Sequence, residues 1–310
     1  MTVASDARLA EGQSAAAVPP ETPLHRFLSD YFESWVAAAA LVLLAAIIAL
    51  AIIAPWIVPQ NPYDLAQVDV LESRLAPGEK NSVSGYTYWL GTDGAGRDLL
   101  SAMLYGVRIS LTVGALSGLI ALAIGAAVGL VAAYVGGRIE SLIMRVVDLQ
   151  LSFPAILLAL MLIAVLGKGV DKIIIALVTV QWAYYARTVR ATALVESRKE
   201  YVEAARCLGL SQNRILLRHI LPNCLPPLIV VATVQTAHAI ALEATLSFLG
   251  VGLPQTEPSL GLLISNGFEY MLSGKYWISF FPGILLLLTI MAINLVGDQL
   301  RDVLNPRLRR

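Results

Sequence analysis

Long apolar stretches separated by shorter polar segments make up most of this chain of 310 residues. A helix needs about 20 mostly apolar residues to cross the hydrocarbon core of a bilayer. The fourth apolar stretch is the weakest, because Gln181, Arg187 and Arg190 lie near its end. The pattern predicts an all-α polytopic membrane protein with six transmembrane helices, at about 35–57, 109–137, 141–166, 172–191, 224–247 and 280–299.

The second stretch is free of charged residues and carries two pairs of glycines spaced four residues apart. These pairs are Gly114 with Gly118 and Gly125 with Gly129. Small residues at this spacing allow membrane helices to approach closely. We expect them to lie in a helix–helix contact; the alternative is glycine merely tolerated inside a membrane helix.

The polar segments divide the chain into regions. Residues 1–34 form an N-terminal tail that is too polar to pack and is expected to be loose up to about Pro23. After the first span, residues 58–106 form a large segment of loops and short helices rich in Pro and Gly. Residues 107–300 form a core of five spans that contains a polar segment at 196–222, and residues 301–310 form a C-terminal tail.

The distribution of positive charge predicts the orientation. Lys and Arg are enriched in cytosolic loops. If both termini are cytosolic, the cytosolic segments hold 15 of the 22 Lys and Arg residues, and the other side keeps seven. The polar segment 196–222 is then cytosolic, and residues 58–106 are extracytoplasmic.

Composition agrees with a membrane protein and excludes several classes of site. Hydrophobic residues are 57% and charged residues 14%, against roughly 45–50% and 25% in soluble domains. The net charge of zero gives no indication of nucleic-acid binding. Cys207 and Cys224 lie beside the cytosolic segment, so neither a disulfide nor a metal site is expected. No phosphate-binding Gly-x-x-x-x-Gly-Lys-Ser/Thr sequence is present, so this chain is not expected to bind ATP by a P-loop.

The segment 196–222 is a charged, helix-forming island between apolar stretches. It predicts two short helices separated at Gly209, with Ser211 capping the second and Pro222 closing it. A folded polar loop of this kind is best explained by a partner protein that docks on it, with Glu203 beside small residues and able to pair with a cation. The alternative is a solvated surface helix with incidental alanines.

The spacing within this segment resembles the EAA loop of ABC-importer permeases, which receives the motor ATPase. The family pattern is Glu-Ala-Ala, three residues, Gly, nine residues, Ile, any residue and Leu-Pro. His219 stands at the Ile position, as is usual in the peptide-transporting branch. The matching positions are Glu203, Ala204, Ala205, Gly209, Leu221 and Pro222.

A second segment, residues 90–98 followed by 104–111, is similar to the one that precedes the second span in dipeptide, oligopeptide and nickel permeases. The residues themselves indicate a Gly-rich turn followed by an interfacial helix that carries Arg108. We expect Asp93, Arg97 and Asp98 to form an ion-pair network that fixes the entry angle of this helix; a ligand-binding role is the alternative. The family usually has Arg at the position of Ala102.

A third segment, residues 243–253 followed by 258–261, also resembles that branch, in which Trp is common at the position of Leu260. Glu243 is costly to expose to lipid, so we expect it to face the bundle, a partner or water. Whether it contacts cargo or only backbone groups is open. The other polar residues considered for the pathway, each also able to bond helices together, are His238, Gln181, Gln150 and Asn294.

The three segments together identify the chain as a member of the peptide/nickel permease group, resembling its second permease subunit. The resemblance implies a type I ABC-importer permease fold in the cell (inner) membrane and a non-catalytic subunit without a cofactor of its own. It also implies three kinds of partner: a second permease in a heterodimer, two cytosolic ATPases that hold ATP and Mg, and an extracytoplasmic solute-binding protein.

The cargo and two rival classes remain open. Permeases with these segments transport dipeptides, longer peptides, nickel chelates or other small polar solutes. A secondary transporter driven by an ion gradient would need paired acidic groups near the bilayer midplane and repeated halves, and the spans show neither. A membrane scaffold without transport is the third possibility.

Overall fold

The computed structural model describes residues 22–82, 84–257 and 259–304, so residues 1–21 and 305–310 of the tails expected at 1–34 and 301–310 lie outside the described residues. The described residues form an all-helical bundle without β-strands, and only two isolated β-bridges occur in the loops. The helices are α1 (Pro23–Phe32), α2 (Trp35–Ile57), α3 (Leu99–Val135), α4 (Gly137–Ser152), α5 (Ala155–Leu166), α6 (Val170–Glu196), α7 (Glu200–Cys207), α8 (Gln212–Ile215), α9 (Leu221–Phe248), α10 (Leu260–Phe268) and α11 (Trp277–Leu304). Shorter 3₁₀ turns at Leu65–Gln67, Val70–Glu72 and Met271–Ser273 and a π-helical turn at Leu216–Ile220 complete the list.

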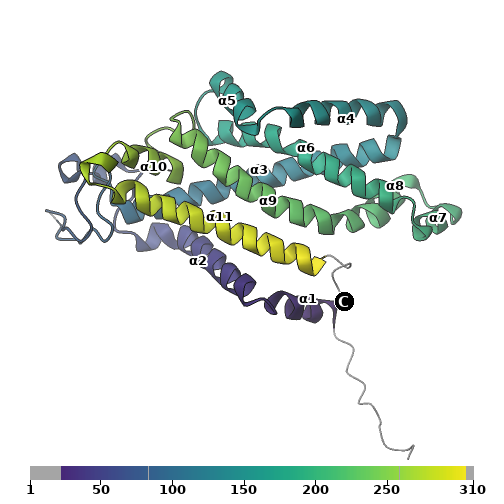
Figure 1. Ribbon diagram of the computed structural model, residues 1–310, viewed down its shortest axis with the longest axis horizontal. Coiled ribbons are helices and arrows are strands. Elements are labelled where there is room, and N and C mark those ends of the chain that lie inside the picture. Colours follow the sequence, from purple (N-terminus) through teal and green to yellow (C-terminus); the bar gives the residue numbers. More distant parts are fainter. Residues whose placement is uncertain (1–21, 83, 258, 305–310) are drawn as a thin grey trace, which may run out of the picture.

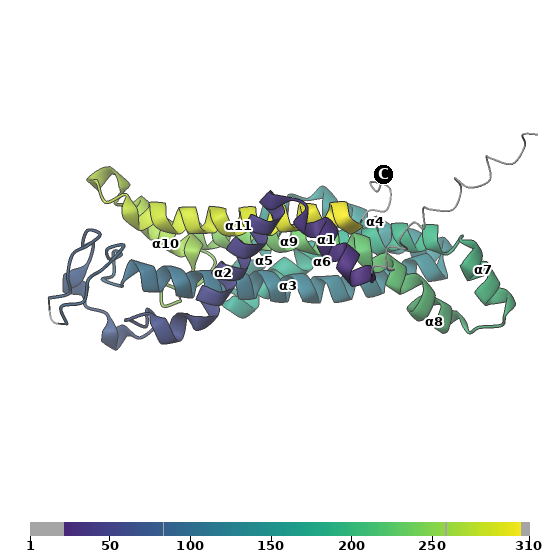
Figure 2. The ribbon, with the colours of Figure 1, turned by 90° about the horizontal axis from the view of Figure 1, so that it is seen from below.

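The bundle is elongated, and its long helices run roughly along its length (Figure 1). The loops that join α2 to α3, together with α10, gather at one end, which we call the cap end. Helices α7 and α8 project at the opposite end, which we call the loop end (Figure 2). The two polar regions of the sequence, residues 58–106 and 196–222, therefore lie at the cap end and the loop end, respectively.

Most of the predicted spans coincide with observed helices. Helix α2 has the predicted bounds, and Ser34 caps it by accepting a hydrogen bond from the backbone N–H of Ala37 at 3.3 Å. Helix α3 begins ten residues before the predicted start because Asp98 caps its first turn. At a rise of 1.5 Å per residue its 37 residues span about 55 Å, well beyond the bilayer core, so its first turns extend into the cap end.

The third predicted span is wrong as a single helix. Helices α4 and α5 meet at a bend of 93°, and the break falls at Phe153 and Pro154. A residue that precedes proline is forced out of the helical region, and Phe153 adopts an extended conformation. Helix α4 is amphipathic and α5 is apolar, but mostly apolar residues continue across the break from Leu151 to Leu157, so hydrophobicity alone could not reveal it.

By length and composition, four helical stretches could cross a membrane, or five if the bent pair α4–α5 counts as one span. These four are α2, α3, the continuous stretch from Gln212 to Phe248, and α11. Helix α6, the fourth predicted span, is not among them. The count of six spans therefore stays a prediction.

Helix α3 lies at the centre of the bundle and contacts α6 and α9 along its length. A Cβ atom added at Gly125 would collide with the carbonyl oxygen of Trp182, and one at Gly129 with that of Ala186. Both carbonyls belong to α6, so these glycines let two helix backbones touch, as the spacing predicted. Gly114 and Gly118 face α9, where an added Cβ atom would first meet the side chains of Ile240 and Thr236, respectively.

The N-terminal region is partly packed, contrary to the expectation for residues 1–34. Thr22 caps α1, and Tyr31 of α1 is buried against Ala37 and Val303. The amide of Gln299 in α11 donates to the carbonyl oxygen of Tyr31 at 3.4 Å. The polar composition concealed this contact because the helix uses only one face to pack.

Candidate functional site

The polar segment 196–222 folds at the loop end as two short helices and a π-helical turn. Gly209 separates α7 from α8 and has a φ of +70°, a left-handed conformation that favours glycine. Ser211 precedes α8, but its side chain makes no capping hydrogen bond. Pro222 does not close the second helix as predicted; it lies in the first turn of α9, where its missing N–H does no harm.

One face of this segment packs into the bundle. Val202 and Ala205 of α7 are buried in the same cluster as Tyr185 and Val189 of α6. Ile215, Ile220 and Cys224 extend that cluster into the start of α9. The loop is therefore joined by apolar contacts to two of the long helices.

The opposite face of α7 is exposed. Glu203 and Ala204 are exposed, whereas Ala205, the third residue of the predicted motif, is buried. Leu208 is 80% exposed, which is unusual for a leucine at the end of a helix. The exposed surface therefore combines a carboxylate, a small residue and an apolar side chain. At the start of α9, Leu221 is half-buried and Pro222 is exposed.

Tyr201 connects the loop to both neighbouring helices, a role that the sequence did not indicate. Its hydroxyl donates to Glu196 Oε2 at 2.7 Å and accepts from Asn223 Nδ2 at 3.2 Å. Lys199 binds the other oxygen of Glu196 at 2.6 Å. Burial and the adjacent carboxylate of Glu196 raise the pKa of Tyr201 to about 12, so its hydroxyl remains protonated at neutral pH and keeps this bridge.

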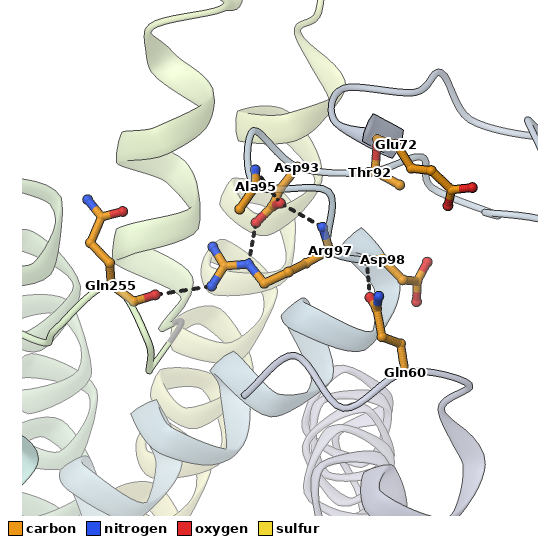
Figure 3. A network of polar contacts seen from close by, with 8 residues as sticks. All are labelled: Gln60, Glu72, Thr92, Asp93, Ala95, Arg97, Asp98 and Gln255. Carbon is orange, nitrogen blue, oxygen red and sulfur yellow. Dashed lines mark hydrogen bonds and ion pairs between the residues drawn. The ribbon is translucent and has the colours of Figure 1, made fainter. Parts of the chain in front are cut away.

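The predicted ion-pair network at the cap end is divided into two parts (Figure 3). Arg97 Nε pairs with Asp93 Oδ2 at 2.7 Å, and Arg97 Nη1 donates to the carbonyl oxygen of Gln255 at 3.2 Å. Asp98 takes no part in the ion pair, because its carboxylate caps α3 by accepting the backbone N–H of Ser101 at 2.8 Å. The pair therefore fixes the loop after α9 against the entry to α3.

Glu243 is fully buried and faces the bundle, one of the alternatives open from the sequence. Its carboxylate accepts hydrogen bonds from Ser110 of α3 at 2.7 Å and from Ser247 of α9 at 2.8 Å, and also from Ser259, the N-cap residue of α10. Three elements therefore meet at this carboxylate. The arrangement supports a structural role and leaves no surface of Glu243 for cargo.

The other candidate pathway residues do not form a common site. Gln181 is buried and donates to the backbone carbonyl of Gln235 at 3.0 Å. His238 is exposed and Asn294 is half-buried. Among the described residues, no hydrogen bond joins any two of the side chains of Glu243, Gln181, His238 and Asn294, and no cluster of His, Cys, Asp or Glu could hold a metal ion.

An open groove of about 680 Å³ runs between α2, α3 and α9. Along α3 it extends from Arg108 to Ala126, which is about 27 Å at 1.5 Å per residue and close to the thickness of a bilayer core. Its lining on α9 begins at Leu221, where the polar segment ends. The walls are apolar except for four side chains: Arg108, Thr112, Thr233 and Thr236. The three threonines were not identified from the sequence, because only the register of the packed helices brings them together.

Comparison with known proteins identifies two families along the chain. Residues 125–310 match the family described as binding-protein-dependent transport system inner membrane component. Residues 22–77 match the N-terminal TM domain of oligopeptide transport permease C. The two matches confirm the resemblance found in the three sequence segments.

Several curated relatives span almost the same length. The dipeptide transport system permease protein DppC of Escherichia coli is 41% identical over 303 residues, covering 98% of this chain and 99% of the relative. A putative peptide transport system permease protein of Brucella suis is 44% identical over 269 residues, 87% of each chain. The Bacillus subtilis dipeptide permease DppC is 37% identical over 274 residues, 88% of this chain and 82% of the relative.

The fold resembles a solved membrane transporter. A chain from the inward-facing MetNI methionine ABC transporter superposes with a TM-score of 0.55 at 21% identity, covering 67% of this chain and 98% of its own length. This likeness shows the fold of an ABC-importer permease. On the family matches and the identity to full-length relatives, the chain belongs to the binding-protein-dependent transport system inner membrane component family.

Proposed function

We propose that this protein is the second permease subunit of an ATP-driven importer for di- or oligopeptides. Its relatives are named as dipeptide and peptide transport permeases. The observation that carries the proposal is the position of the polar segment 196–222: its outer face is exposed at the loop end, and its inner face is packed into α6 and α9. In this arrangement the loop end and both termini are cytosolic, six spans cross the inner membrane, and the cap end is extracytoplasmic.

The partners follow from this role. A second permease forms a heterodimer with this chain, two cytosolic subunits bind ATP and Mg, and a solute-binding protein delivers cargo to the cap end. ATP hydrolysis belongs to the partners, and this chain provides half of the pathway. The groove suits that task because its lining extends from Arg108, at the end nearest the cap, to Leu221, the first residue of α9.

The motion of the ATPases reaches the groove through packed side chains. Glu203, Ala204 and Gly209 form the docking surface, and Ala205 anchors it in the cluster shared with α6 and α9. A displacement of α7 therefore moves the start of α9 at Leu221 and Pro222, which borders the groove. This contiguous set of contacts is the physical basis that we propose for coupling.

Reconstituted complexes test the coupling. Glu203→Lys reverses the charge of an exposed side chain, and Gly209→Pro forbids the observed positive φ. We expect both variants to insert into the membrane and to assemble with their partners. The uptake stimulated by loaded binding protein should fall at least about tenfold, which corresponds to a loss of about 1.4 kcal/mol in the interaction with the ATPase. Uptake and ATPase activity are measured in proteoliposomes.

The matched control for this experiment is Asp298→Lys, which reverses an exposed carboxylate on α11 outside the loop. It should leave uptake unchanged. Normal coupled uptake in both loop variants would contradict the proposal that the ATPases dock on the segment 196–222. Failure of the unaltered complex to import any peptide would contradict the proposed peptide transport.

The groove disfavours an ion-gradient transporter. Such a protein needs acidic groups along the pathway, and the groove contains no carboxylate. Glu243, a fully buried carboxylate among the long helices, is enclosed by serine hydroxyls. A dependence of uptake on a proton or sodium gradient, and not on ATP, would reverse this conclusion.

A further inference from the structure

Arg108 is the one charged side chain that lines the groove, and it lies at the end nearest the cap. It shares a face of α3 with Leu111, Thr112 and Ala115, which continue the lining at helical spacing. Its side chain is exposed and forms no salt bridge or hydrogen bond with another described residue. A guanidinium without a charged partner therefore lies at one end of a groove whose other lining residues are apolar or threonine.

The charges of Arg108 and of Glu257, in the loop after α9, both act on the hydroxyl of Tyr63. The ring of Tyr63 packs edge-on against Tyr105, one turn before Arg108, with ring centroids 5.0 Å apart. Burial and the charge of Glu257 raise the pKa of Tyr63, and the charge of Arg108 acts in the opposite direction. Both charges are thus within electrostatic reach of one hydroxyl, yet Arg108 and Glu257 do not pair with each other.

An exposed, unpaired Arg108 at the end of the groove fits the carboxylate end of a zwitterionic ligand. A peptide in water carries an ammonium group at one end and a carboxylate at the other. A guanidinium is well suited to the carboxylate, because its planar fork can donate two parallel hydrogen bonds. Below Arg108 the groove offers apolar walls and threonine hydroxyls, which can accept side chains of different kinds.

We propose that Arg108 binds the C-terminal carboxylate of the peptide cargo as it enters the groove from the cap end. This assignment rests on the proposed peptide function and makes Arg108 a cargo-binding residue of the permease itself, separate from the selectivity of the solute-binding protein.

The test compares one dipeptide with a free C-terminus and the same dipeptide with an amidated C-terminus. Uptake is measured in proteoliposomes containing the complete complex, with binding protein preloaded with each peptide so that delivery is equal. A charged hydrogen-bonded pair contributes enough to change rates roughly 10- to 100-fold. We expect Arg108→Gln to lower uptake of the free-acid peptide by about tenfold or more, and to leave uptake of the amidated peptide unchanged.

Two further variants complete the experiment. Arg108→Lys keeps the charge and should restore part of the uptake of the free-acid peptide. Lys80→Gln neutralises an exposed cation of the cap segment outside the groove and should not distinguish the two peptides.

Three outcomes would overturn the assignment. An equal loss for both peptides would indicate a structural role, and an equal loss that varies with the content of anionic lipid would indicate a headgroup contact. Loss of the second permease on purification of Arg108→Gln would indicate a subunit contact. In each case the unaltered complex would still import the free-acid peptide, so the proposed function would survive.

Discussion

Among single residues, Glu243 shows most clearly how the membrane environment decides the role of a side chain. A carboxylate within an apolar bundle is costly unless hydrogen bonds compensate for the lost water. Here the hydroxyls of Ser110, Ser247 and Ser259 supply those bonds. The sequence predicted that this residue avoids lipid, but two of its serine partners, Ser110 and Ser259, lie on other elements and could not be deduced.

Replacing Glu243 should therefore reduce stability. Glu243→Ala leaves three buried hydroxyls without their acceptor and opens a cavity, so we expect a loss of roughly 2–4 kcal/mol. Glu243→Gln retains one acceptor oxygen and should lose less. Thermal unfolding of the purified protein in detergent measures both. Equal midpoints for Glu243→Ala and the unaltered protein would show that these bonds do not stabilise the bundle.

Gly209 and Arg97 show why some predictions about single residues were confirmed and others were not. The positive φ of Gly209 followed from the sequence because a turn between two helices requires it. The ion-pair partner of Arg97 did not, because Asp98 directly follows Arg97 and Asp93 lies four residues before it, so the sequence offered both carboxylates. Capping of α3 uses Asp98, which leaves Asp93 for the ion pair.

At the level of elements, the long apolar stretches predicted the bounds of α2, α9 and α11 to within a few residues. The predictions failed where a proline changed the course of the helix. Pro154 interrupts an apolar run and produces the bend between α4 and α5. Pro222 was predicted to end a helix, yet it lies in the first turn of α9, where proline is tolerated. A hydrophobic pattern shows which residues avoid water but not where the helix axis turns.

The contact between α3 and α6 gives a prediction at this scale. Gly129→Ala adds a Cβ atom where the backbone of Ala186 already lies, so the helices must separate. We expect a loss of about 1–3 kcal/mol in detergent unfolding experiments. Gly283→Ala on α11 is the matched control, because its added Cβ meets no atom within 4 Å. Its midpoint should be unchanged or higher, and an equal effect of the two substitutions would contradict the close packing.

For the whole molecule, the central feature is that packed helices connect the polar segment at the loop end to the groove that leads toward the cap end. The segment 196–222 packs on α6 and on α9, and α9 also lines the groove, whose opposite end holds Arg108. The family was evident from three short segments of sequence. The groove was not, because it is formed by residues of α2, α3, α9 and α11 that only the packing brings together.

The most direct test of this account uses the two natural cysteines. Cys207 is exposed on α7 and Cys224 is buried, so a membrane-impermeant maleimide should label only Cys207. We predict labelling in inside-out membrane vesicles but not in sealed right-side-out vesicles, and reduced labelling once the ATPase subunits are bound. Cys207→Ser should abolish the signal. Labelling of Cys207 from the extracytoplasmic side would contradict the proposed coupling.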